Sequence, residues 1–413
     1  MFRQTIPSGW RRILRLQQNA QGKLLTGVLI HKPENIFYFT SFYPSEPCFL
    51  LVPTQEEPEL IVAKSALAEA KRDSLIPVVA GDMNIAQTAY NRMITKKMHK
   101  HPPSSAISGV LRKIGDSPLG LEYDYLSLFL FKFLNIRKPV DMSPEINNLR
   151  GIKDSFETER LTQACHIAEQ AIDHTRKNIT LGMSEKEVAG IFQAKAQALG
   201  ADESRCLVKS GANTALAFSR WMSGILETGP LFVDFGARVQ GYWSDITRMF
   251  YLGSELDKSF LDNYELVLKA RSIALDCMNP GQSIYDPEIK IRELFRENGV
   301  EANMVYSPGH GIGLEINEDP LLSYSPPDRK DEDKFKPIAE KTGLLGSSMK
   351  VLVEELQKSD PEPGFQKNQI LVLEPGLFFN HLGVSIKDMI HIKDKPHILS
   401  TLSTHPEDVI IPV

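Results

Sequence analysis

The sequence of 413 residues has few cysteines, no long apolar run and no large excess of either charge. Its four cysteines, Cys48, Cys165, Cys206 and Cys277, are far apart and form no C-x-x-C pair. A disulfide framework and a cysteine-based zinc site are therefore not expected. The spacing favours reduced thiols in the core of a cytoplasmic protein.

Signals for membrane insertion, secretion or nucleic-acid binding are also missing. The longest apolar run, Tyr125–Leu134, is interrupted by Lys132 and has about half of the roughly twenty residues that a spanning helix needs. Residues 1–16 contain no apolar segment typical of a signal peptide. A net charge of −5 provides no basic surface for nucleic acid. We therefore expect a soluble protein with neither a membrane nor a nucleic-acid partner.

The composition is that of a globular protein with more than one domain. Hydrophobic residues make up 42% and charged residues 24% of the chain, a balance that can bury a full core. The length predicts two to three domains, or a small domain beside a large one. A boundary falls near Met142-Ser143-Pro144, so we assign one domain to residues 1–145 and another to residues 146–413.

The first region alternates short strand and helix patterns. Leu24–Ile30, Ile36–Phe39 and Cys48–Val52 are β-type runs separated by turn residues, which include Lys32 to Asn35. Ala63–Ala70 is then typical of a helix, and Pro77–Ala80 of another strand. This alternation predicts a small α/β domain, in which no group of residues indicates chemistry.

The second region contains the same order of elements twice. Asp154 with Glu157 and Ser184 with Glu187 have the spacing of capping boxes, which predicts two helices. Two strands follow them, and a second pair of helices precedes a second pair of strands. The expected strands are Leu231–Gly236, Tyr242–Tyr251, Ile370–Glu374 and Val384–Ile392, and the later helices are Asp257–Met278 and Ser283–Asn298. Two such halves suggest a pseudo-repeat with a shared site between them.

Residues 323–364 interrupt this pattern. They are rich in proline, lysine, aspartate and glutamate, and they are long for a connection inside a compact domain. A solvated surface insertion explains this composition, and a lid over the site is the alternative.

Two aspartates mark the first predicted hairpin. Asp234 and Asp245 are equally distant from the midpoint between Val239 and Gln240, which would place them opposite each other. Like charges in that position destabilise a hairpin unless a cation lies between them. Both aspartates also lie in apolar segments, where bare carboxylates are costly. A cation is therefore expected, and solvated aspartates on an edge hairpin are the alternative.

The second predicted hairpin and a glycine-rich segment add three more candidates. Glu374 and Lys387 are equally distant from the midpoint between Asn380 and His381, and such a pair is most often a cross-strand salt bridge. His310 lies between glycines that leave its imidazole unobstructed. The local sequence is compatible with either a structural or a functional histidine there.

Three segments in this order resemble motifs of the pita-bread metallohydrolase family, which includes aminopeptidase P, prolidase and creatinase. Residues 233–248 resemble the block D-F-G-x-x-x-x-G-Y-x-S-D-x-T-R, residues 309–318 the block G-H-G-x-G-L-x-x-H-E, and residues 373–376 the E-P-G motif. The resemblance implies an α/β (α+β) protein with a creatinase-type N-terminal domain and a pita-bread catalytic domain. It also implies cleavage of Xaa-Pro peptides as the default activity, and a possible homodimer.

The resemblance assigns a metal site in which one position is altered. In the family, two aspartates, one histidine and two glutamates hold two divalent ions. The corresponding positions are Asp234, Asp245, His310, Glu374 and Lys387, so a lysine replaces the bridging glutamate. Family histidines that contact substrate are also replaced. The implied substrate-binding positions are Phe218, Asn317 and Tyr306, the last standing where many aminopeptidases P have a further histidine.

The charge of this set predicts fewer ions than in the family. Three carboxylates and one ammonium sum to −2, so one divalent ion would neutralise them and two would leave +2. Each misplaced charge at about 4 Å costs on the order of 4 kcal/mol at an effective dielectric of 20. We therefore expect one ion of Mn, Fe, Co or Zn, held by Asp245, His310 and Glu374. Lys387 would take the place of the second ion and pair with Asp234.

These residues suggest a diverged Xaa-Pro-peptidase-like hydrolase that acts on a short peptide or another small C–N-bonded substrate. The ion would activate water or a carbonyl group, and Lys387 or Glu318 would move protons. The replacements at Phe218 and Asn317 argue against efficient peptide turnover, because such groups position the substrate and stabilise the intermediate.

Two alternatives to this enzyme remain open. One is a non-catalytic binding module that uses the inherited cleft. The other is a metal-free cluster of ion pairs formed by the three carboxylates and Lys387. That cluster requires a protonated carboxylate, or a further cation such as Arg248 that reaches into it.

Overall fold

The computed structural model describes residues 8–81, 117–127, 130–131, 134, 136–216, 219–323 and 363–412. The chain divides into two compact units, Met1–Arg150 and Gly151–Val413. Almost all of the predicted insertion at 323–364, whether surface segment or lid, lies outside the described residues, as does Phe218.

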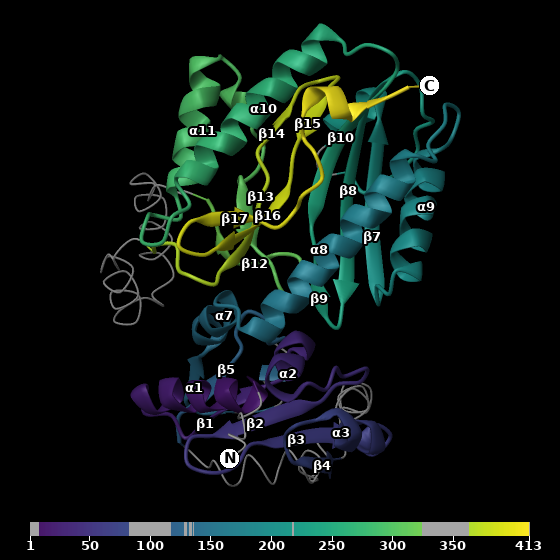
Figure 1. Ribbon diagram of the computed structural model, residues 1–413. Helices are drawn as coiled ribbons and strands as arrows, with labels where there is room; N and C mark the ends of the chain where they lie inside the picture. The colour runs from purple at the N-terminus through teal and green to yellow at the C-terminus, as the bar shows by residue number, and fades with distance from the viewer. Residues whose placement is uncertain are drawn as a thin grey trace, which may run out of the picture. The chain divides into compact units, whose positions relative to one another are not determined.

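The first unit is built on a six-stranded mixed sheet with the strand order β4-β3-β2-β1-β5-β6 (Figure 1). The β1–β2 and β2–β3 pairs are antiparallel and the other three pairs are parallel. The strands are β1 Gly27–Ile30, β2 Phe49–Pro53, β3 Glu59–Ala63, β4 Val78–Gly81, β5 Leu119–Leu121 and β6 Pro139–Asp141. The helices are α1 Ser8–Gly22, α2 Pro33–Thr40 and α3 Leu67–Asp73, and α7 Ser143–Gly151 ends at the boundary. The predicted α/β architecture is confirmed.

One predicted strand of this unit is wrong. Residues 36–39 belong to the helix α2, because Pro33 stands in its first turn and its fixed φ suits that position. The buried carboxylate of Glu122 accepts hydrogen bonds from the backbone N–H groups of His31 and Lys32, at 2.6 and 3.0 Å. The residues that we interpreted as a turn are therefore the start of a helix.

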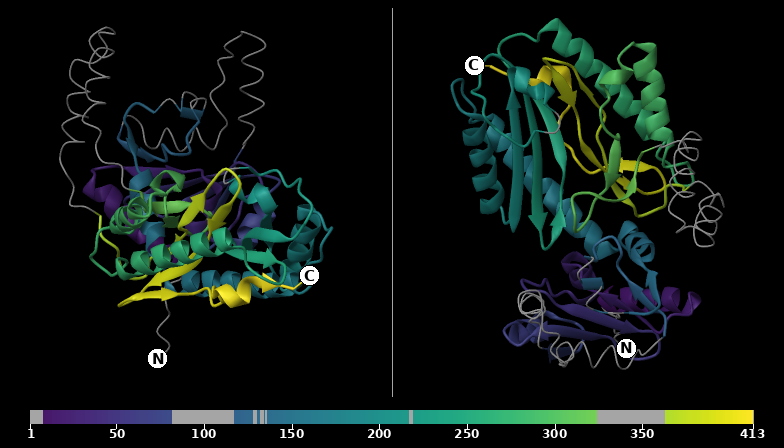
Figure 2. Two further views of the ribbon diagram at one scale, coloured as in Figure 1. Left: turned by 90° about the horizontal axis from the view of Figure 1, so that it is seen from above. Right: turned by 180° about the vertical axis from the view of Figure 1, so that it is seen from behind.

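The second unit contains two helix pairs and two main sheets. The helices α8 and α9 pack on β7 and β8, whereas α10 packs on β14 and β15 (Figure 2). The first sheet has the order β18-β10-β8-β7, with β9 paired to β8, and the second has the order β12-β11-β13-β16-β17. The helices are α8 Ser155–Arg176, α9 Glu185–Ala198, α10 Lys258–Asp276 and α11 Asp286–Glu297. The strands are β7 Glu203–Ser210, β8 Gly229–Val239, β9 Tyr242–Trp243, β10 Ile246–Leu252, β11 Gly309–Gly311, β12 Glu318–Leu321, β13 Ile370–Leu373, β14 Gly376–Phe378, β15 Gly383–Ser385, β16 Asp388–Ile392, β17 Pro396–Ile398 and β18 Ile410–Ile411.

Both predicted capping boxes are confirmed. The Asp154 carboxylate accepts a hydrogen bond from the backbone N–H of Glu157 at 2.9 Å, and the Glu157 carboxylate accepts one from the backbone N–H of Asp154 at 3.0 Å. Ser184 and Glu187 form the same reciprocal pair at the start of α9. These local signals fix where α8 and α9 begin, and packing places α8 against β8, the strand that carries Asp234.

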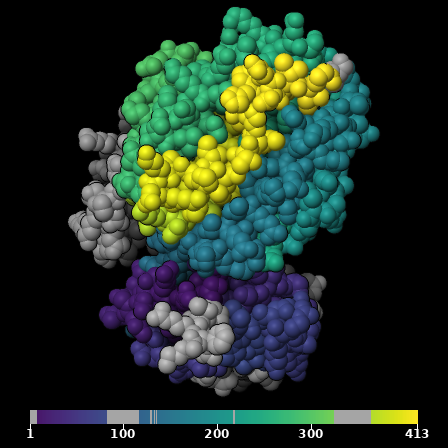
Figure 3. Space-filling model, in the orientation of Figure 1, coloured from purple at the N-terminus to yellow at the C-terminus, as the bar shows by residue number. Residues whose placement is uncertain are grey.

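A short backbone bridge joins the two halves of this unit. The N–H of Lys387 donates to the carbonyl of Thr247 at 3.2 Å, and the reverse bond is 3.4 Å. Arg248, which is 2% exposed, donates to the carbonyl oxygens of Thr247 and Lys387 at 2.9 and 2.7 Å. The bridge holds β10 of the first hairpin against the second hairpin. In the space-filling view, the C-terminal residues of the second half (yellow) lie between the first half (teal) and the earlier residues of the second half (green) (Figure 3).

A buried ionic network fixes Arg248 itself. Its Nη2 donates to the Asp388 carboxylate at 2.8 Å, and Arg271 and Ser400 donate to the same group. Burial alone would raise the pKa of Asp388, but Arg248 and Arg271 outweigh it and hold the pKa below its usual value. Asp388 is therefore ionised. Arg248 bonds to Asp388 and does not enter the predicted cluster of carboxylates.

All four cysteines are free, and burial raises the pKa of the Cys48 thiol to about 12. Within the part of the chain that the structure describes, no helix is both long enough and apolar enough to cross a bilayer.

Replacing Arg248 with alanine should lower the free energy of unfolding by about 3 kcal/mol, because it removes one partner of a buried ion pair and the hydrogen bonds that Arg248 donates to three backbone carbonyls, those of Thr247, Lys387 and Leu402. Urea unfolding of wild type and variant measures this loss. Arg296→Ala is the control, since Arg296 is 63% exposed and pairs with Glu301 at the surface, where a bridge contributes about 1 kcal/mol or less. Equal losses for the two variants would contradict the clamping role of Arg248.

Candidate active site

The structure brings five of the predicted site residues into one cluster in the second unit. Asp234 lies on β8, Asp245 between β9 and β10, and His310 on β11. Glu374 follows β13 and Lys387 precedes β16. Asp245 is completely buried, and the side chains of Glu374 and Lys387 are each 12% exposed. Carboxylates from both halves of the pseudo-repeat thus meet at a shared site.

The turn of the first hairpin is centred one residue later than predicted, which shifts the pairing of its strands by two residues. The turn is formed by Gln240 and Gly241, with φ of 46° and 89°, as a two-residue hairpin turn requires. Asp234 consequently pairs with Thr247 instead of Asp245. Asp245 is two residues before Thr247, so the two aspartates are diagonal neighbours on the same face of the sheet. They still converge, because a shift of two residues keeps the face.

The predicted register of the second hairpin is confirmed. Leu373 pairs with Asp388, which places Glu374 opposite Lys387. The Nζ of Lys387 lies 3.0 Å from Glu374 Oε2, which is the expected cross-strand salt bridge. The same ammonium lies 3.1 Å from Asp245 Oδ2 and 3.6 Å from Asp234 Oδ1. Lys387 therefore contacts all three carboxylates rather than Asp234 alone.

A second cation in the cluster was missed by the sequence analysis. Arg205 on β7 donates from Nη2 to Asp245 Oδ1 at 2.6 Å and lies 3.3 Å from Asp234 Oδ2. The further cation that a metal-free cluster requires is thus Arg205, whereas the suggested Arg248 bonds to Asp388. The signal in the sequence was the charge count, because three carboxylates exceed one ammonium by two. Only the pairing of β7 with β8 shows which cation contacts the carboxylates.

The electrostatics of the cluster depend on burial and on these two cations. Burial would lower the pKa of Lys387, but Asp234, Asp245 and Glu374 raise it well above its usual value. Burial raises the pKa of Asp234, because it disfavours a charged carboxylate, and the nearby cations offset only part of this rise. For Asp245 the cations Lys387 and Arg205 outweigh burial and lower the pKa. Lys387 is therefore a fixed positive charge, which favours an electrostatic role over proton transfer.

His310 presents one ring nitrogen to the cluster. Its Nδ1 lies 2.8 Å from the carbonyl oxygen of Gly311, which can only accept, so Nδ1 carries a proton. Its Nε2 lies 3.6 Å from Glu374 Oε1 and 3.8 Å from Asp245 Oδ2, beyond hydrogen-bond distance. An imidazole whose second nitrogen is held by a backbone carbonyl in this way can accept a proton or bind an ion through Nε2.

The other predicted site residues occupy different surroundings. Tyr306 is held near Glu374, and its hydroxyl lies 3.1 Å from Ser385 Oγ. Burial and Glu374 raise its pKa above the usual value, so the phenol stays protonated. The Glu318 carboxylate accepts from Lys153 Nζ at 3.2 Å, and both side chains are almost fully buried. This contact favours an anchoring role for Glu318 over proton transfer, and Asn317 is exposed.

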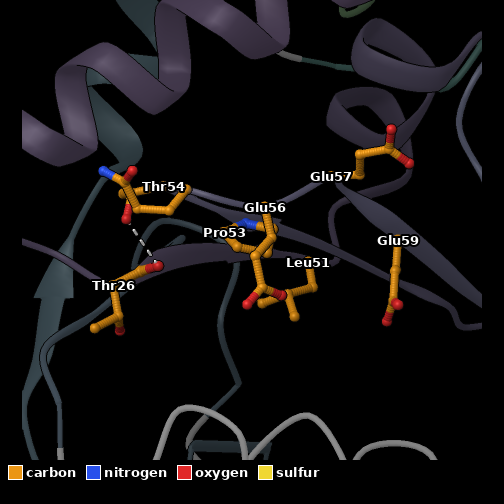
Figure 4. Close-up of a pocket in the computed structure, with 8 residues that line it drawn as sticks. Thr26, Leu51, Pro53, Thr54, Glu56, Glu57 and Glu59 are labelled. Atoms are coloured by element: carbon orange, nitrogen blue, oxygen red, sulfur yellow. Dashed lines mark hydrogen bonds between the residues drawn. The ribbon is translucent and has the colours of Figure 1, made fainter.

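A pocket of about 250 Å³ lies in the first unit and is unrelated to this cluster (Figure 4). Thr26 and Thr54 form one side of it, and Glu56, Glu57 and Glu59 contribute carboxylates. None of the predicted site residues lines this pocket.

Comparisons with known proteins cover both units. The model of metallopeptidase family M24 matches residues 159–394, and that of the creatinase/prolidase N-terminal domain matches residues 12–152. An Xaa-Pro dipeptidase of Pyrococcus furiosus is 30% identical over 303 residues, which are 72% of this chain and 80% of that protein. A putative dipeptidase of Bacillus subtilis is 25% identical over 398 residues, 94% of this chain and 95% of its own length.

Solved structures show the same fold. The prolidase from Pyrococcus furiosus superimposes with a TM-score of 0.74 at 25% identity, covering 94% of this chain and all of that one. A prolidase from Thermococcus sibiricus has a TM-score of 0.78 at 20% identity, covering 99% and 100%, and shows the fold alone. The predicted pita-bread fold and the resemblance to the family are confirmed. The chain is a peptidase-like hydrolase of a family that uses divalent metal ions.

The donor set does not fit the two-ion centre that this family implies. Among the residues that the structure describes, no three of His, Cys, Asp and Glu are placed to hold a metal ion as they stand. The ammonium of Lys387 lies among the carboxylates, and Arg205 takes the other oxygen of Asp245. Three carboxylates and two cations sum to −1, instead of the −2 that we expected. One divalent ion would change this to +1, and two would give +3.

Lys387→Met should lower the free energy of unfolding by about 3 kcal/mol, because Asp234 and Asp245 would keep only Arg205 of their two cations and Glu374 would lose the ammonium 3.0 Å from it. Denaturant unfolding measures the change. The matched control is Lys367→Met, since the side chain of Lys367 is 61% exposed and its pair with Asp394 lies at the surface. A variant as stable as its control would mean that Lys387 does not hold the cluster together.

Proposed function

Because this chain belongs to metallopeptidase family M24, we propose that it is a diverged Xaa-Pro-peptidase-like hydrolase acting on a short peptide or another small C–N-bonded substrate. We propose further that its centre holds at most one divalent ion, of Mn, Fe, Co or Zn. The observation that carries this proposal is the position of Lys387, whose Nζ lies about 3 Å from both Glu374 and Asp245. An ammonium in that place excludes the bridge between two ions.

Charge supports a reduced number of ions. Without an ion the cluster carries −1, and with one ion it carries +1, so either state is one unit from neutrality. A second ion adds two further positive charges to a site that is almost completely buried. At about 4 Å and an effective dielectric of 20, each such charge costs on the order of 4 kcal/mol. The proposal therefore admits no ion or one ion, and excludes two.

His310 and Tyr306 are the groups that would act on a bound substrate. When one ion is bound, His310, Asp245 and Glu374 would hold it, and it would supply Lewis-acid chemistry. With Lys387 as it lies, these donors are not arranged around an ion, so we assign no reaction step to one. His310 Nε2 can accept a proton, because its Nδ1 proton is held by Gly311. The neutral phenol of Tyr306 would contribute a hydrogen bond beside Glu374.

A binding module without catalysis is the second candidate, and one observation favours it. Lys387 and Arg205 pair with all three carboxylates, so the cluster is stabilised without an ion. Such a cleft could bind a short peptide and release it unchanged. The possible homodimer and the cytoplasmic location stay predictions.

Metal content beside activity distinguishes the two candidates. Purified wild type, Lys387→Glu and His310→Ala would be assayed on Xaa-Pro dipeptides and amides with and without Mn²⁺. A hydrolase should cleave at least one of them, and His310→Ala should abolish that activity. Lys387→Glu restores a carboxylate, so it should bind one ion per chain and increase the dipeptidase rate.

Two results would count against parts of this proposal. Two tightly bound ions per wild-type chain would refute the reduced centre. Peptide binding that is unchanged in metal-free protein, together with no cleavage by wild type or Lys387→Glu, would favour the binding module. The control is Lys367→Glu, an exposed lysine whose replacement should alter neither ion content nor cleavage.

A further inference from the structure

Arg205, Gly236 and Asp245 form a row across neighbouring strands of the first sheet. Arg205 on β7 pairs directly with Gly236 on β8. Phe235 pairs with Ile246, and the N–H of Ser244 donates to the carbonyl of Ala237 at 2.8 Å, so Asp245 continues the register opposite Gly236. The arginine and the aspartate are therefore separated by the width of one strand, with a glycine between them.

The glycine is what allows Arg205 to cross that strand. A Cβ at position 236 would lie 3.2 Å from Arg205 Cγ and 3.3 Å from Arg205 Nε. It would also lie 2.8 Å from the carbonyl oxygen of Ser244. Because the side-chain position is empty, the guanidinium lies over the backbone of β8 and its Nη2 reaches Asp245 Oδ1 at 2.6 Å.

Asp245 is consequently held by one cation from each half of the second unit. Arg205, from the first sheet, bonds to Oδ1, and Lys387, from the second hairpin, lies 3.1 Å from Oδ2. Asp234 is shared in the same way, at 3.3 Å from Arg205 and 3.6 Å from Lys387. Both carboxylates that the family would offer to two ions are thus engaged by the chain's own side chains.

We propose that Arg205 is a built-in cation that, together with Lys387, substitutes for the ions of a two-ion centre, so that such a centre can form only when both are removed. This inference rests on the proposed function in one respect, the limit of one ion in the wild type. It adds a residue and a requirement that the replacement at position 387 does not imply.

The charge count and the oxygens that remain available predict the number of ions for each variant. Without Arg205, three carboxylates and Lys387 carry −2, which one divalent ion neutralises. With glutamate at position 387 and Arg205 retained, the site carries −3, which one ion changes to −1 and two ions to +1. Charge alone does not separate these states, but Arg205 still holds Asp245 Oδ1 and so denies that oxygen to a second ion. With both cations removed, four carboxylates carry −4, and two divalent ions balance them.

A cycle of four proteins tests this requirement. Wild type, Arg205→Met, Lys387→Glu and the double variant would be equilibrated with Mn²⁺ and dialysed, and the metal per chain would then be measured. We expect at most one ion for the wild type, one for each single variant and two for the double variant. Methionine is chosen because an unbranched side chain can follow the same path over Gly236 without a charge.

Thermal unfolding with and without a chelator provides a second readout that does not depend on activity. Ligand that binds the folded state raises the melting temperature, so the double variant should lose the most on chelation. Arg238→Met is the matched control. Arg238 also lies across β7 and β8, where it pairs with Glu203 at 2.9 Å, and its replacement should leave the ion count at the wild-type value.

Two results would overturn the inference. One is a Lys387→Glu protein that binds two ions as tightly as the double variant, since Arg205 would then be no obstacle. The other is a double variant that binds no more ions than the Lys387→Glu protein. If a methionine variant fails to fold, Arg205→Gln in the same backgrounds gives the same count. Ion numbers that follow the series while no protein cleaves any Xaa-Pro peptide would refute the proposed hydrolase and leave this inference intact.

Discussion

Three carboxylates buried in one cluster are the constraint on which the rest of this site depends. Asp245 is completely buried and Asp234 is 5% exposed, so neither can be stabilised by water. Uncompensated charges in such a place cost several kcal/mol each. In the family that this chain belongs to, metal ions provide the compensation, and here a lysine and an arginine lie in contact with the same oxygens. The lysine on the second hairpin is therefore accompanied by a second cation, Arg205, from β7 at the edge of the first sheet.

The scaffold that holds the cluster consists of a second set of charges. Arg248 binds the carbonyl oxygens of Thr247 and Lys387 as well as the Asp388 carboxylate, and Arg271 binds the same carboxylate from α10. These residues adjoin the site without entering it. The positions of Thr247 and Lys387 relative to each other are thereby set by backbone bonds and a buried ion pair, and do not depend on what binds between the carboxylates. Such a scaffold can keep its geometry while the centre changes its chemistry.

This separation is consistent with the comparisons. The fold is shared with prolidases over almost the whole chain, while Lys387 lies among the carboxylates of the cluster. His310 and Tyr306 remain close to Glu374, so a substrate would still meet an acceptor nitrogen and a hydroxyl. What differs is the source of positive charge. An ammonium and a guanidinium attract anions, but they cannot offer open coordination positions to water as an ion does.

The sequence by itself determined the family, the two capping boxes, the register of the second hairpin and four members of the cluster beside Lys387. These follow from local spacing and from ordered motifs, which depend on residues close together in the chain. The helix at residues 33–40 and the turn at Gln240 and Gly241 have local causes in Pro33 and Gly241, whereas tertiary structure alone decided the entry of Arg205. Arg205 is 40 residues from Asp245 in the chain, and their contact depends on strand pairing and on the missing side chain of Gly236. The need for another cation could be counted from the sequence. The pairing of β7, β8 and the segment before β10 decides which side chain provides that cation.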